Sequence, residues 1–330
     1  MKPSLNWDSF RQKAFESGFS ACSFAPADQL DDLRPTFLEW IDSGKAGEMG
    51  YLERNVDLRL DPGKLIEGAK TVISLAAPYY YPLDEHVAGN PRISRYALGN
   101  DYHEILRARG HELLDWINKE IGPAKGRVFT DSAPVFEREW ARRSGLGWIG
   151  KNGCLIIPKQ GSYFFLTEII TDLDLSTLLS SGLPSSSSSR LPSPGLSSDL
   201  LPPHCGTCTR CIDSCPTGAL AGDGSMDPRK CISYLTIEHK GDIPEEFHGK
   251  WSDWVFGCDI CQDVCPWNSK PFQSMIPELA PRSGLMEITG RTMEGMDEAT
   301  FMQLFDGTPV KRTGRTGILR NFAFLNRKSE

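Results

Sequence analysis

The apolar residues in the first half of the chain repeat with two different periods. Between Tyr102 and Ile121 they recur at helical spacing, and a shorter amphipathic stretch runs from Asn6 to Ser17. Strand-like runs lie between and after these segments, at 71–80, 127–130, 154–158 and 163–173. The alternation predicts an α/β (α+β) domain over residues 1–175, although it does not give the order of the strands.

Composition divides the rest of the chain. Between Ser176 and Leu200, eleven of the twenty-five residues are serine, which is typical of a linker or a surface insertion, here at 176–201. A high density of cysteine then predicts a small second domain at 202–271. Residues 272–330 form a C-terminal extension with a basic tail. The tail contains Lys311, Arg312, Arg315, Arg320, Arg327 and Lys328.

The overall composition narrows the class of protein. The chain has 330 residues, 39% of them apolar, and a formal charge of −7, so any contact with nucleic acid must be local. The segment 1–10 lacks a basic stretch followed by an apolar run, and no window approaches the roughly 18 apolar residues of a membrane span. We therefore expect a cytoplasmic monomer that does not contact a membrane.

Eight of the ten cysteines lie between Cys205 and Cys265. Because cytoplasmic thiols are normally reduced, such clustering indicates bound metal rather than disulfides. The other two, Cys22 and Cys154, stand in apolar surroundings, and we expect them to be buried core thiols.

The spacing of the clustered cysteines is typical of bacterial ferredoxins. The first four, followed by Pro216, match the run C-x2-C-x2-C-x3-C-P, and a second run ending at Pro266 repeats its last three members. Val255 stands where the second run would have its first cysteine, and Cys231 is the available replacement. The pattern predicts two 4Fe-4S clusters.

In this pattern three closely spaced thiolates hold one cluster, and the fourth reaches the neighbouring cluster. One predicted ligand set is Cys205, Cys208, Cys211 and Cys265. The other is Cys215, Cys231, Cys258 and Cys261. Two zinc sites are the competing interpretation, but zinc ligands usually come as separated C-x2-C pairs. Two clusters imply a partner redox centre, either in another protein or in the first domain.

Residues Gly145–Asn152, GLGWIGKN, nearly match the phosphate-binding loop G-x4-G-K-[ST]. Asn152 has no hydroxyl group for magnesium. The segment before the motif, 135–144, has a helical pattern, and the segment after it, 154–158, has an extended one, which reverses the required strand-loop-helix order. The motif therefore does not indicate a nucleotide hydrolase.

Several blocks together make the sequence similar to a known family, the epoxyqueuosine reductases. The blocks are YLERNVDLRLDP (51–62), RYALGNDYH (95–103), FTDSAPVFEREWARRSGLGWIGKN (129–152), GSYFFLTEI (161–169), CGTCTRCIDSCPTGAL (205–220), CISYLTIEHKG (231–241) and GCDICQDVCPWN (257–268). The resemblance runs in order from about residue 45 to 320, and 129–152 is its most specific part.

The resemblance implies an enzyme that uses cobalamin and two 4Fe-4S clusters to reduce epoxyqueuosine to queuosine at the wobble position of tRNA. This would be the last step of queuosine synthesis, with electrons from an external low-potential donor. The implied architecture is a cobalamin-binding domain, related in fold to that of the reductive dehalogenases, followed by a small dicluster ferredoxin-like domain.

The resemblance also implies catalysis by Asp131, since removing the oxygen of an epoxide requires a proton that a carboxylic acid can supply. Asp131 follows the predicted strand 127–130, where functional groups gather in α/β folds. A helix cap or a surface salt bridge is the structural alternative.

Ten further positions match the family and are expected, together with Asp131, to contact cobalamin or the tRNA anticodon region. They are Arg54, Tyr102, His103, Arg138, Lys151, Asn152, Gly161, Ser162, Ser233 and Lys240. His103 is either a cobalt ligand, a proton carrier or a structural residue. Arg138, Arg142 and Arg143 recur at helical spacing and form either a phosphate-binding face or a solvated one.

Two features depart from the family pattern. The segment 176–201 is longer than the usual connection, and many members continue into a helical-repeat domain, whereas this chain stops at Glu330. Binding of tRNA is then expected to rest on the basic tail and the two main domains. Two other functions stay open: a dicluster electron carrier without corrinoid, and a corrinoid reductive dehalogenase, a class that is typically exported.

Overall fold

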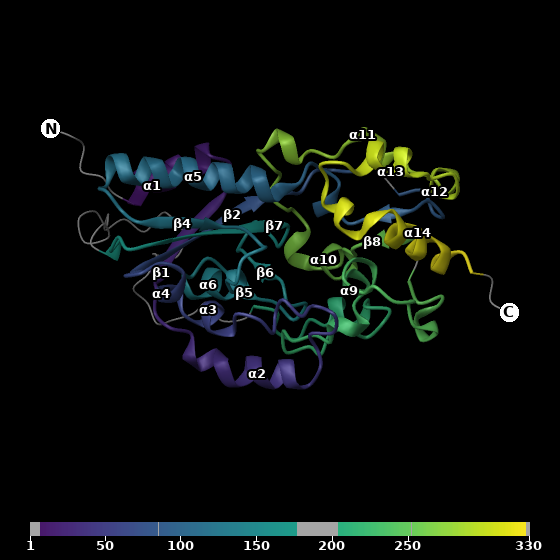
Figure 1. The fold of residues 1–330 in the computed structure, drawn as a ribbon, viewed down its shortest axis with the longest axis horizontal. Helices are drawn as coiled ribbons and strands as arrows, with labels where there is room; N and C mark the ends of the chain where they lie inside the picture. The colour runs from purple at the N-terminus through teal and green to yellow at the C-terminus, as the bar shows by residue number, and fades with distance from the viewer. Residues whose placement is uncertain (1–6, 85, 177–203, 252, 328–330) are drawn as a thin grey trace.

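A four-stranded antiparallel sheet organises the first part of the molecule, seen in a computed structural model that describes residues 7–84, 86–176, 204–251 and 253–327 (Figure 1). Its strands are β1 (Ala21–Pro26), β2 (Thr71–Pro78), β4 (Gly126–Phe129) and β7 (Phe164–Thr171), in the order β1-β2-β7-β4. The predicted strands 71–80, 127–130 and 163–173 are confirmed, whereas β1 was not predicted. Most of the predicted insertion 176–201 lies outside the described residues.

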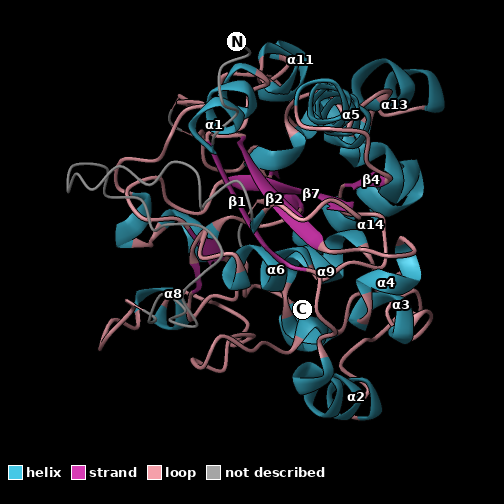
Figure 2. Ribbon diagram, turned by 90° about the vertical axis from the view of Figure 1, so that its left-hand side faces the viewer, coloured by secondary structure: helices cyan, strands magenta, loops and turns pink. Residues whose placement is uncertain are grey.

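Helices cover both faces of this sheet, as Figure 2 shows. On one face lie α1 (Trp7–Glu16) and α5 (Tyr102–Glu120), which closely match the two predicted amphipathic helices. Their apolar sides pack with every second residue of the strands, among them Ile73, Leu75 and Ile169, in one large core. On the other face, α6 (Glu137–Arg143) packs against β1, β2 and β7.

Several short elements complete the first part of the chain. They are α2 (Arg34–Asp42), α3 (Val56–Leu60), α4 (Pro62–Leu65), β3 (Arg92–Ile93), β5 (Trp148–Ile149) and β6 (Leu155–Ile156). The hairpin of β5 and β6 contains the GLGWIGKN motif, so a helix precedes the motif and strands form it and follow it. This order confirms that the motif is not a phosphate-binding loop.

The C-terminal part folds onto the first part. Its elements are α8 (Arg210–Asp213), α9 (Ile232–Ile237), β8 (Trp254–Phe256), α10 (Ile260–Asp263), α11 (Ser283–Met286), α12 (Gly290–Glu294), α13 (Glu298–Phe305) and α14 (Gly314–Leu325). Strand β8 pairs with β3 in parallel, and one core cluster joins Ile93 and Leu98 with Phe256, Phe305 and Ile318. Residues from 272 onward therefore share a core with the segment 93–98.

Within the described residues, no helix combines the length and apolar character that a membrane span requires. The basic tail is largely engaged in internal ion pairs. Lys311 binds Asp306 at 2.6 Å, Arg312 binds Glu238 at 2.8 Å, Arg315 binds Glu298 at 3.2 Å and Arg327 binds Glu245 at 3.1 Å. Arg320 donates to the carbonyl oxygens of Leu235, His239 and Gly241. We infer that much of the tail holds the C-terminal segment in place.

Candidate functional site

Asp131 lies just beyond the end of β4, in a left-handed backbone conformation with φ 54°. Non-glycine residues adopt this conformation rarely, and aspartate does so more readily than most. The preceding residue is fixed to the next strand, since the hydroxyl groups of Thr130 and Thr167 are 3.0 Å apart. The Asp131 side chain is 48% exposed, so one side of the carboxylate is open while the other is held by protein groups.

Two side chains from the start of α5 hold the Asp131 carboxylate. The Tyr102 hydroxyl donates to Oδ2 at 2.7 Å, and His103 Nε2 lies 3.1 Å from the same oxygen. His103 Nδ1 is 2.6 Å from Asp101 Oδ1, and Asp101 also caps α5 by accepting from the His103 backbone N–H at 3.0 Å. We call Asp101, Tyr102, His103 and Asp131 the acid-base cluster.

Charge in the acid-base cluster is shared between His103 and its two carboxylates. Burial lowers the pKa of His103, but hydrogen bonds with Asp101 and Asp131 outweigh this effect and raise it to about 9. Burial also disfavours the charged form of Asp131, which raises its pKa. The hydrogen bonds from His103 and Tyr102 outweigh this effect and bring the pKa of Asp131 below its ordinary value. At neutral pH the His103–Asp131 pair therefore holds one proton between a carboxylate and an imidazole.

Glu137, the first residue of α6, adds a further acid to this surface. Its Oε1 accepts a hydrogen bond from the backbone N–H of Asp131. Burial and the adjacent Asp131 charge raise the pKa of Glu137 to about 8. Sequence reasoning did not single out Asp101 or Glu137, although both lie inside the family-specific blocks 95–103 and 129–152.

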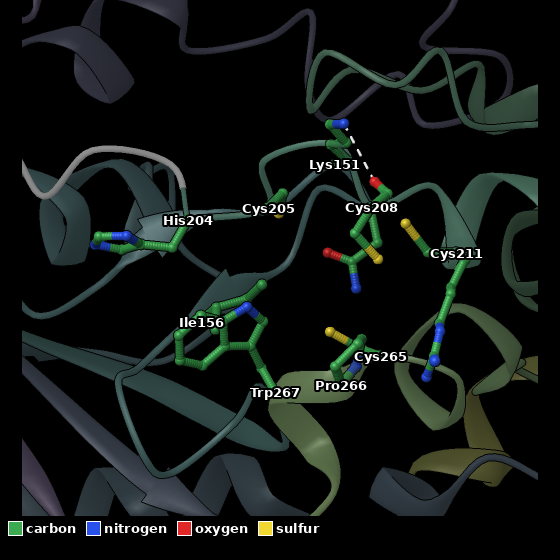
Figure 3. Close-up of a pocket in the computed structure, with 11 residues that line it drawn as sticks. Lys151, Ile156, His204, Cys205, Cys208, Cys211, Cys265, Pro266 and Trp267 are labelled. Carbon is green, nitrogen blue, oxygen red and sulfur yellow. Dashed lines mark hydrogen bonds between the residues drawn. The ribbon is translucent and has the colours of Figure 1, made fainter.

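The first predicted ligand set encloses a cavity of about 260 Å³. Cys205, Cys208, Cys211 and Cys265 line this cavity with Trp267, and Figure 3 shows the four cysteines around a common space. Cys211 lies in α8, while Cys265 comes from the end of the second cysteine run, 54 residues further on. The fold thus brings both cysteine runs to one cavity.

The second predicted ligand set is also brought together. Cys231 precedes α9, Cys258 precedes α10 and Cys261 lies within α10. Burial raises the pKa of Cys231 and Cys258, and the nearby thiols, including Cys215, raise both further. Among the described residues, no three His, Cys, Asp or Glu side chains are arranged to hold a single metal ion.

The two remaining cysteines have different surroundings. Cys22 packs against the large core, and burial raises its pKa to about 12, as expected for a core thiol. Cys154 is only partly buried, and its thiol interacts with that of Cys261. The prediction that Cys154 is a core thiol therefore did not include its contact with Cys261, because the sequence does not show that these two residues are neighbours.

Several predicted site residues join the sheet to the cysteine-rich loops. Lys151 Nζ donates to the carbonyl oxygens of Gly206 at 2.8 Å and Cys208 at 3.2 Å. Asn152 is buried and donates through Nδ2 to the Cys261 carbonyl oxygen at 3.4 Å. Ser162 Oγ accepts hydrogen bonds from Gln262 at 3.1 Å and Asn268 at 2.9 Å.

The other predicted residues are more dispersed. Arg138 donates to the Gly153 carbonyl oxygen, between α6 and β6. Arg54 and Lys240 are exposed, and Ser233 lies on α9. Of the ten predicted residues other than Asp131, the structure places Tyr102 and His103 in hydrogen bonds with that aspartate. Arg142 and Arg143 bind Glu139 at 2.5 and 2.6 Å, which favours a structural role for this helix face.

Two residues near the acid-base cluster were not predicted as site residues. The positive charge of the Arg312 guanidinium stabilises the ionised form of Asp131 and helps to lower the pKa of that carboxyl group. The Tyr51 ring lies 5.9 Å from the same guanidinium and is 38% exposed. The sequence does not predict this contact, because residues 51 and 312 are far apart along the chain.

Gly161 provides a test of how tightly the two parts of the molecule are joined. Its φ is +91°, and an added Cβ would lie 2.3 Å from Asn268 Oδ1, which accepts from the Ser162 N–H at 2.7 Å. Gly161→Ala is expected to lower the free energy of unfolding by about 2–4 kcal/mol, because backbone strain and overlap add. Anaerobic thermal unfolding followed by circular dichroism measures this loss.

Gly68→Ala is the matched control, since Gly68 has φ +76° but open space around its Cβ position. This variant should lower the free energy of unfolding only through backbone strain, by about 1–2 kcal/mol. Equal losses in the two variants would show that the contact with Asn268 is not tight.

Comparison with known proteins places the chain in one family. Residues 59–132 match the family model described as epoxyqueuosine reductase QueG, DUF1730, and residues 204–268 match that of a 4Fe-4S double cluster binding domain. The epoxyqueuosine reductase of Cellulophaga algicola is 42% identical over 320 residues, covering 96% of this chain and 97% of that protein. The one from Leadbetterella byssophila is 43% identical over 317 residues, covering 94% and 95%.

Solved structures agree in fold. A crystal structure of epoxyqueuosine reductase with an epoxyqueuosine-modified tRNA-Tyr stem loop is 27% identical, with a TM-score of 0.80, covering 96% of this chain and 80% of that one. The Bacillus subtilis epoxyqueuosine reductase, with its catalytic aspartate loop swung out of the active site, is 26% identical with a TM-score of 0.81 and the same coverage. The chain belongs to the epoxyqueuosine reductase family.

Proposed function

We propose that this chain reduces epoxyqueuosine to queuosine in tRNA, using electrons delivered through two 4Fe-4S clusters. The observation that carries the proposal is the acid-base cluster at the end of the sheet, in a chain where Cys205, Cys208, Cys211 and Cys265 line one cavity. Residues 1–175 would supply the reaction chemistry and 202–271 the clusters. Residues 176–201 would connect them, and 272–330 would complete the core.

The cysteines fit two iron-sulfur clusters. A 4Fe-4S cluster is held by four thiolates around a volume, and the first cysteine set lines a cavity. Cys205, Cys208, Cys211 and Cys265 would hold one cluster, and Cys215, Cys231, Cys258 and Cys261 the other. The match of residues 204–268 to a double cluster domain supports this assignment over two zinc sites. When bound, the clusters would supply single electrons at low potential.

The surroundings of Asp131 are compatible with cobalamin. A corrin ring brings four nitrogen ligands of its own, so the protein needs to supply an open face and polar groups rather than a set of metal ligands. The half-exposed Asp131 carboxylate, with Tyr51 and Arg312 nearby, meets this requirement. Cobalamin would supply a strongly reducing cobalt centre, fed by the clusters and ultimately by an external low-potential donor.

The residues of the acid-base cluster would hold protons and transfer them to the substrate. Converting an epoxide into an alkene consumes two electrons and two protons and releases water. The Asp131 carboxyl group, open on one side, is placed to hand a proton to the epoxide oxygen, and His103 holds that proton at Asp131 Oδ2 until it is needed. Tyr102 keeps the carboxylate in place through its hydroxyl group. Asp101 fixes the orientation of the imidazole ring.

The proposed function is tested by the nucleoside product. Chain purified without oxygen and loaded with iron, sulfide and cobalamin is incubated with epoxyqueuosine-containing tRNA and a strong one-electron reductant, and the digested nucleosides are analysed by mass spectrometry. Queuosine is expected. A chain that binds both clusters and the corrinoid yet leaves epoxyqueuosine unchanged would contradict the proposal, and one that binds no corrinoid would favour a plain electron carrier.

The pH dependence of the reaction should follow His103. Because the raised pKa of about 9 belongs to the folded, ligand-free chain, the proton is present below pH 9 and lost above it. We expect kcat/KM to fall as the pH rises through about 9. In the His103→Gln variant this decline should disappear together with most of the activity, whereas Tyr102→Phe should keep it. An unchanged decline in His103→Gln would remove His103 from the proton path.

A further inference from the structure

Lys151 connects the hairpin of β5 and β6 with the loop that carries the first cysteines. Its Nζ donates to the carbonyl oxygens of Gly206 at 2.8 Å and Cys208 at 3.2 Å, on either side of Thr207. In Figure 3 Lys151 lies next to Cys205 and Cys208, and it lines the cavity of the first ligand set. The ammonium group is therefore held at the edge of the space in which a cluster would be bound.

The turn that carries Lys151 is fixed from several directions. The Gly150 N–H donates to the Cys154 carbonyl oxygen at 2.9 Å, and Asn152 Oδ1 accepts from the Cys154 N–H at 3.2 Å. Arg138 of α6 donates to the Gly153 carbonyl oxygen. Because the turn is held on both sides of Lys151, the lysine side chain reaches the cysteine loop from a rigid base.

The fixed charges that line the cavity have one sign. Lys151 and Arg210 are both cations, and none of the described residues that line the cavity is an aspartate or a glutamate. Apolar side chains, among them Ile156 and Trp267, form another part of the wall, and the ring of Trp267 lies 4.8 Å from that of the buried Trp148. Since such a wall screens charge less than water does, a cation at this cavity acts strongly on a charged group inside it.

A 4Fe-4S cluster becomes more negative by one charge when it accepts an electron. A fixed positive charge nearby stabilises this reduced form, and the net charge and hydrogen bonds around a cluster set its reduction potential. We propose that the ammonium group of Lys151 raises the reduction potential of the cluster held by the first ligand set, and so eases its reduction. One electron passes from the external donor to the cluster, and no bond forms or breaks. This inference rests on the part of the proposed function that assigns two clusters, and not on the reduction of epoxyqueuosine.

A purely structural role for Lys151 makes a different prediction. If the side chain only ties the two carbonyl oxygens to the hairpin, a long side chain with N–H donors would serve equally well whatever its charge. Arginine keeps both the charge and the donors, whereas glutamine keeps donors and has no charge. Comparing Lys151→Arg with Lys151→Gln therefore separates the effect of charge from the tie to the loop.

The reduction potential is measured in chain without cobalamin or RNA. Chain with both clusters is titrated without oxygen, and electron paramagnetic resonance follows the one-electron reduction of each cluster. In Lys151→Gln one of the two steps should move to lower potential. At a fixed potential, the ratio of reduced to oxidised first cluster should fall about threefold to thirtyfold, which corresponds to about 30–90 mV. In Lys151→Arg this step should stay close to its wild-type position, and both variants should keep about eight iron atoms per chain.

Lys119→Gln is the matched control. It removes the same charge from α5, on the sheet face opposite to α6 and the hairpin, where the Lys119 side chain is 81% exposed. Both reduction steps should stay in place in this variant.

Thr207→Glu tests the effect of charge without replacing Lys151. Thr207 is exposed and lies between the two residues that Lys151 contacts, so an added negative charge should lower the potential of the same step. Thr207→Gln, which adds a side chain of the same size without the charge, should leave that step in place.

An unmoved step in Lys151→Gln, or equal shifts in Lys151→Gln and Lys151→Arg, would overturn the inference. If Lys151→Gln loses the cluster, Thr207→Glu decides: an unchanged potential there overturns the inference, and a lowered one supports it. A chain that shows the expected shifts but makes no queuosine would refute the proposed reaction and leave this inference standing. A wild-type chain that binds no cluster at the first ligand set would refute both.

Discussion

A chain in which Cys231 is replaced by alanine is expected to lose one of its two clusters and nearly all of its activity. Iron content should fall from about eight to about four atoms per chain, because a 4Fe-4S cluster requires four thiolate ligands. Cys231 lies outside both ferredoxin runs, but its position before α9 brings it close to Cys215 and Cys258. Iron analysis and electron paramagnetic resonance of the reduced chain measure the loss.

Cys154→Ala is the matched control. Cys154 lies partly buried beside Cys261, yet it belongs to neither predicted ligand set. This variant should keep both clusters, with at most a small change in the spectrum of the second one. If Cys154→Ala loses a cluster while Cys231→Ala retains both, the ligand assignment is wrong and Cys154 takes the place of Cys231.

Asp131→Asn should lower the rate of queuosine formation by about a hundredfold to ten-thousandfold. Asparagine keeps an oxygen that can accept from Tyr102 and His103, so the local structure should persist, but its amide cannot pass on a proton. Cluster absorbance and RNA affinity should be unchanged. The rate is measured in single turnover, so that product release does not mask the loss.

Asp172→Asn controls for a general effect of changing an aspartate beside this sheet. Asp172 directly follows β7, as Asp131 follows β4 at a distance of two residues, and its Oδ1 accepts from the Lys125 backbone N–H at 2.8 Å. This variant should react at close to the wild-type rate. Comparable losses in both variants would mean that the substitutions disturb the sheet rather than the chemistry.

Much of the sheet domain could be predicted because its elements carry strong local patterns. The helix Tyr102–Glu120 repeats its apolar residues over five turns, and β2 and β7 are long apolar runs. Strand β1, ACSFAP, escaped prediction because it is short, rich in small residues and ends in proline. Its pairing with β2, rather than its own composition, makes it a strand.

The candidate site also contains residues that could be predicted from the sequence and residues that could not. The cysteine sets follow from spacing, because the ferredoxin pattern fixes which thiols are neighbours. The acid-base cluster was predicted in part: Asp131, Tyr102 and His103 lie in family blocks, but Asp101 and Glu137 become visible only when α5, α6 and the end of β4 are placed together. Glu168 is the one charged residue in the mostly apolar strand β7, and its full burial becomes visible only in the folded sheet, with α6 packed on β7.

Electron flow from the clusters to the epoxide is tested most directly by following electrons and product in the same samples. Chain loaded with cobalamin and both clusters is reduced by light, freed of excess reductant and mixed with an epoxyqueuosine-modified stem loop, while cluster absorbance and nucleosides are recorded over time. We expect the clusters to be reoxidised as queuosine appears, with two electrons consumed per queuosine, and to stay reduced with an unmodified stem loop. Clusters that stay reduced in the presence of the epoxide, or that are reoxidised without queuosine, would contradict this expectation.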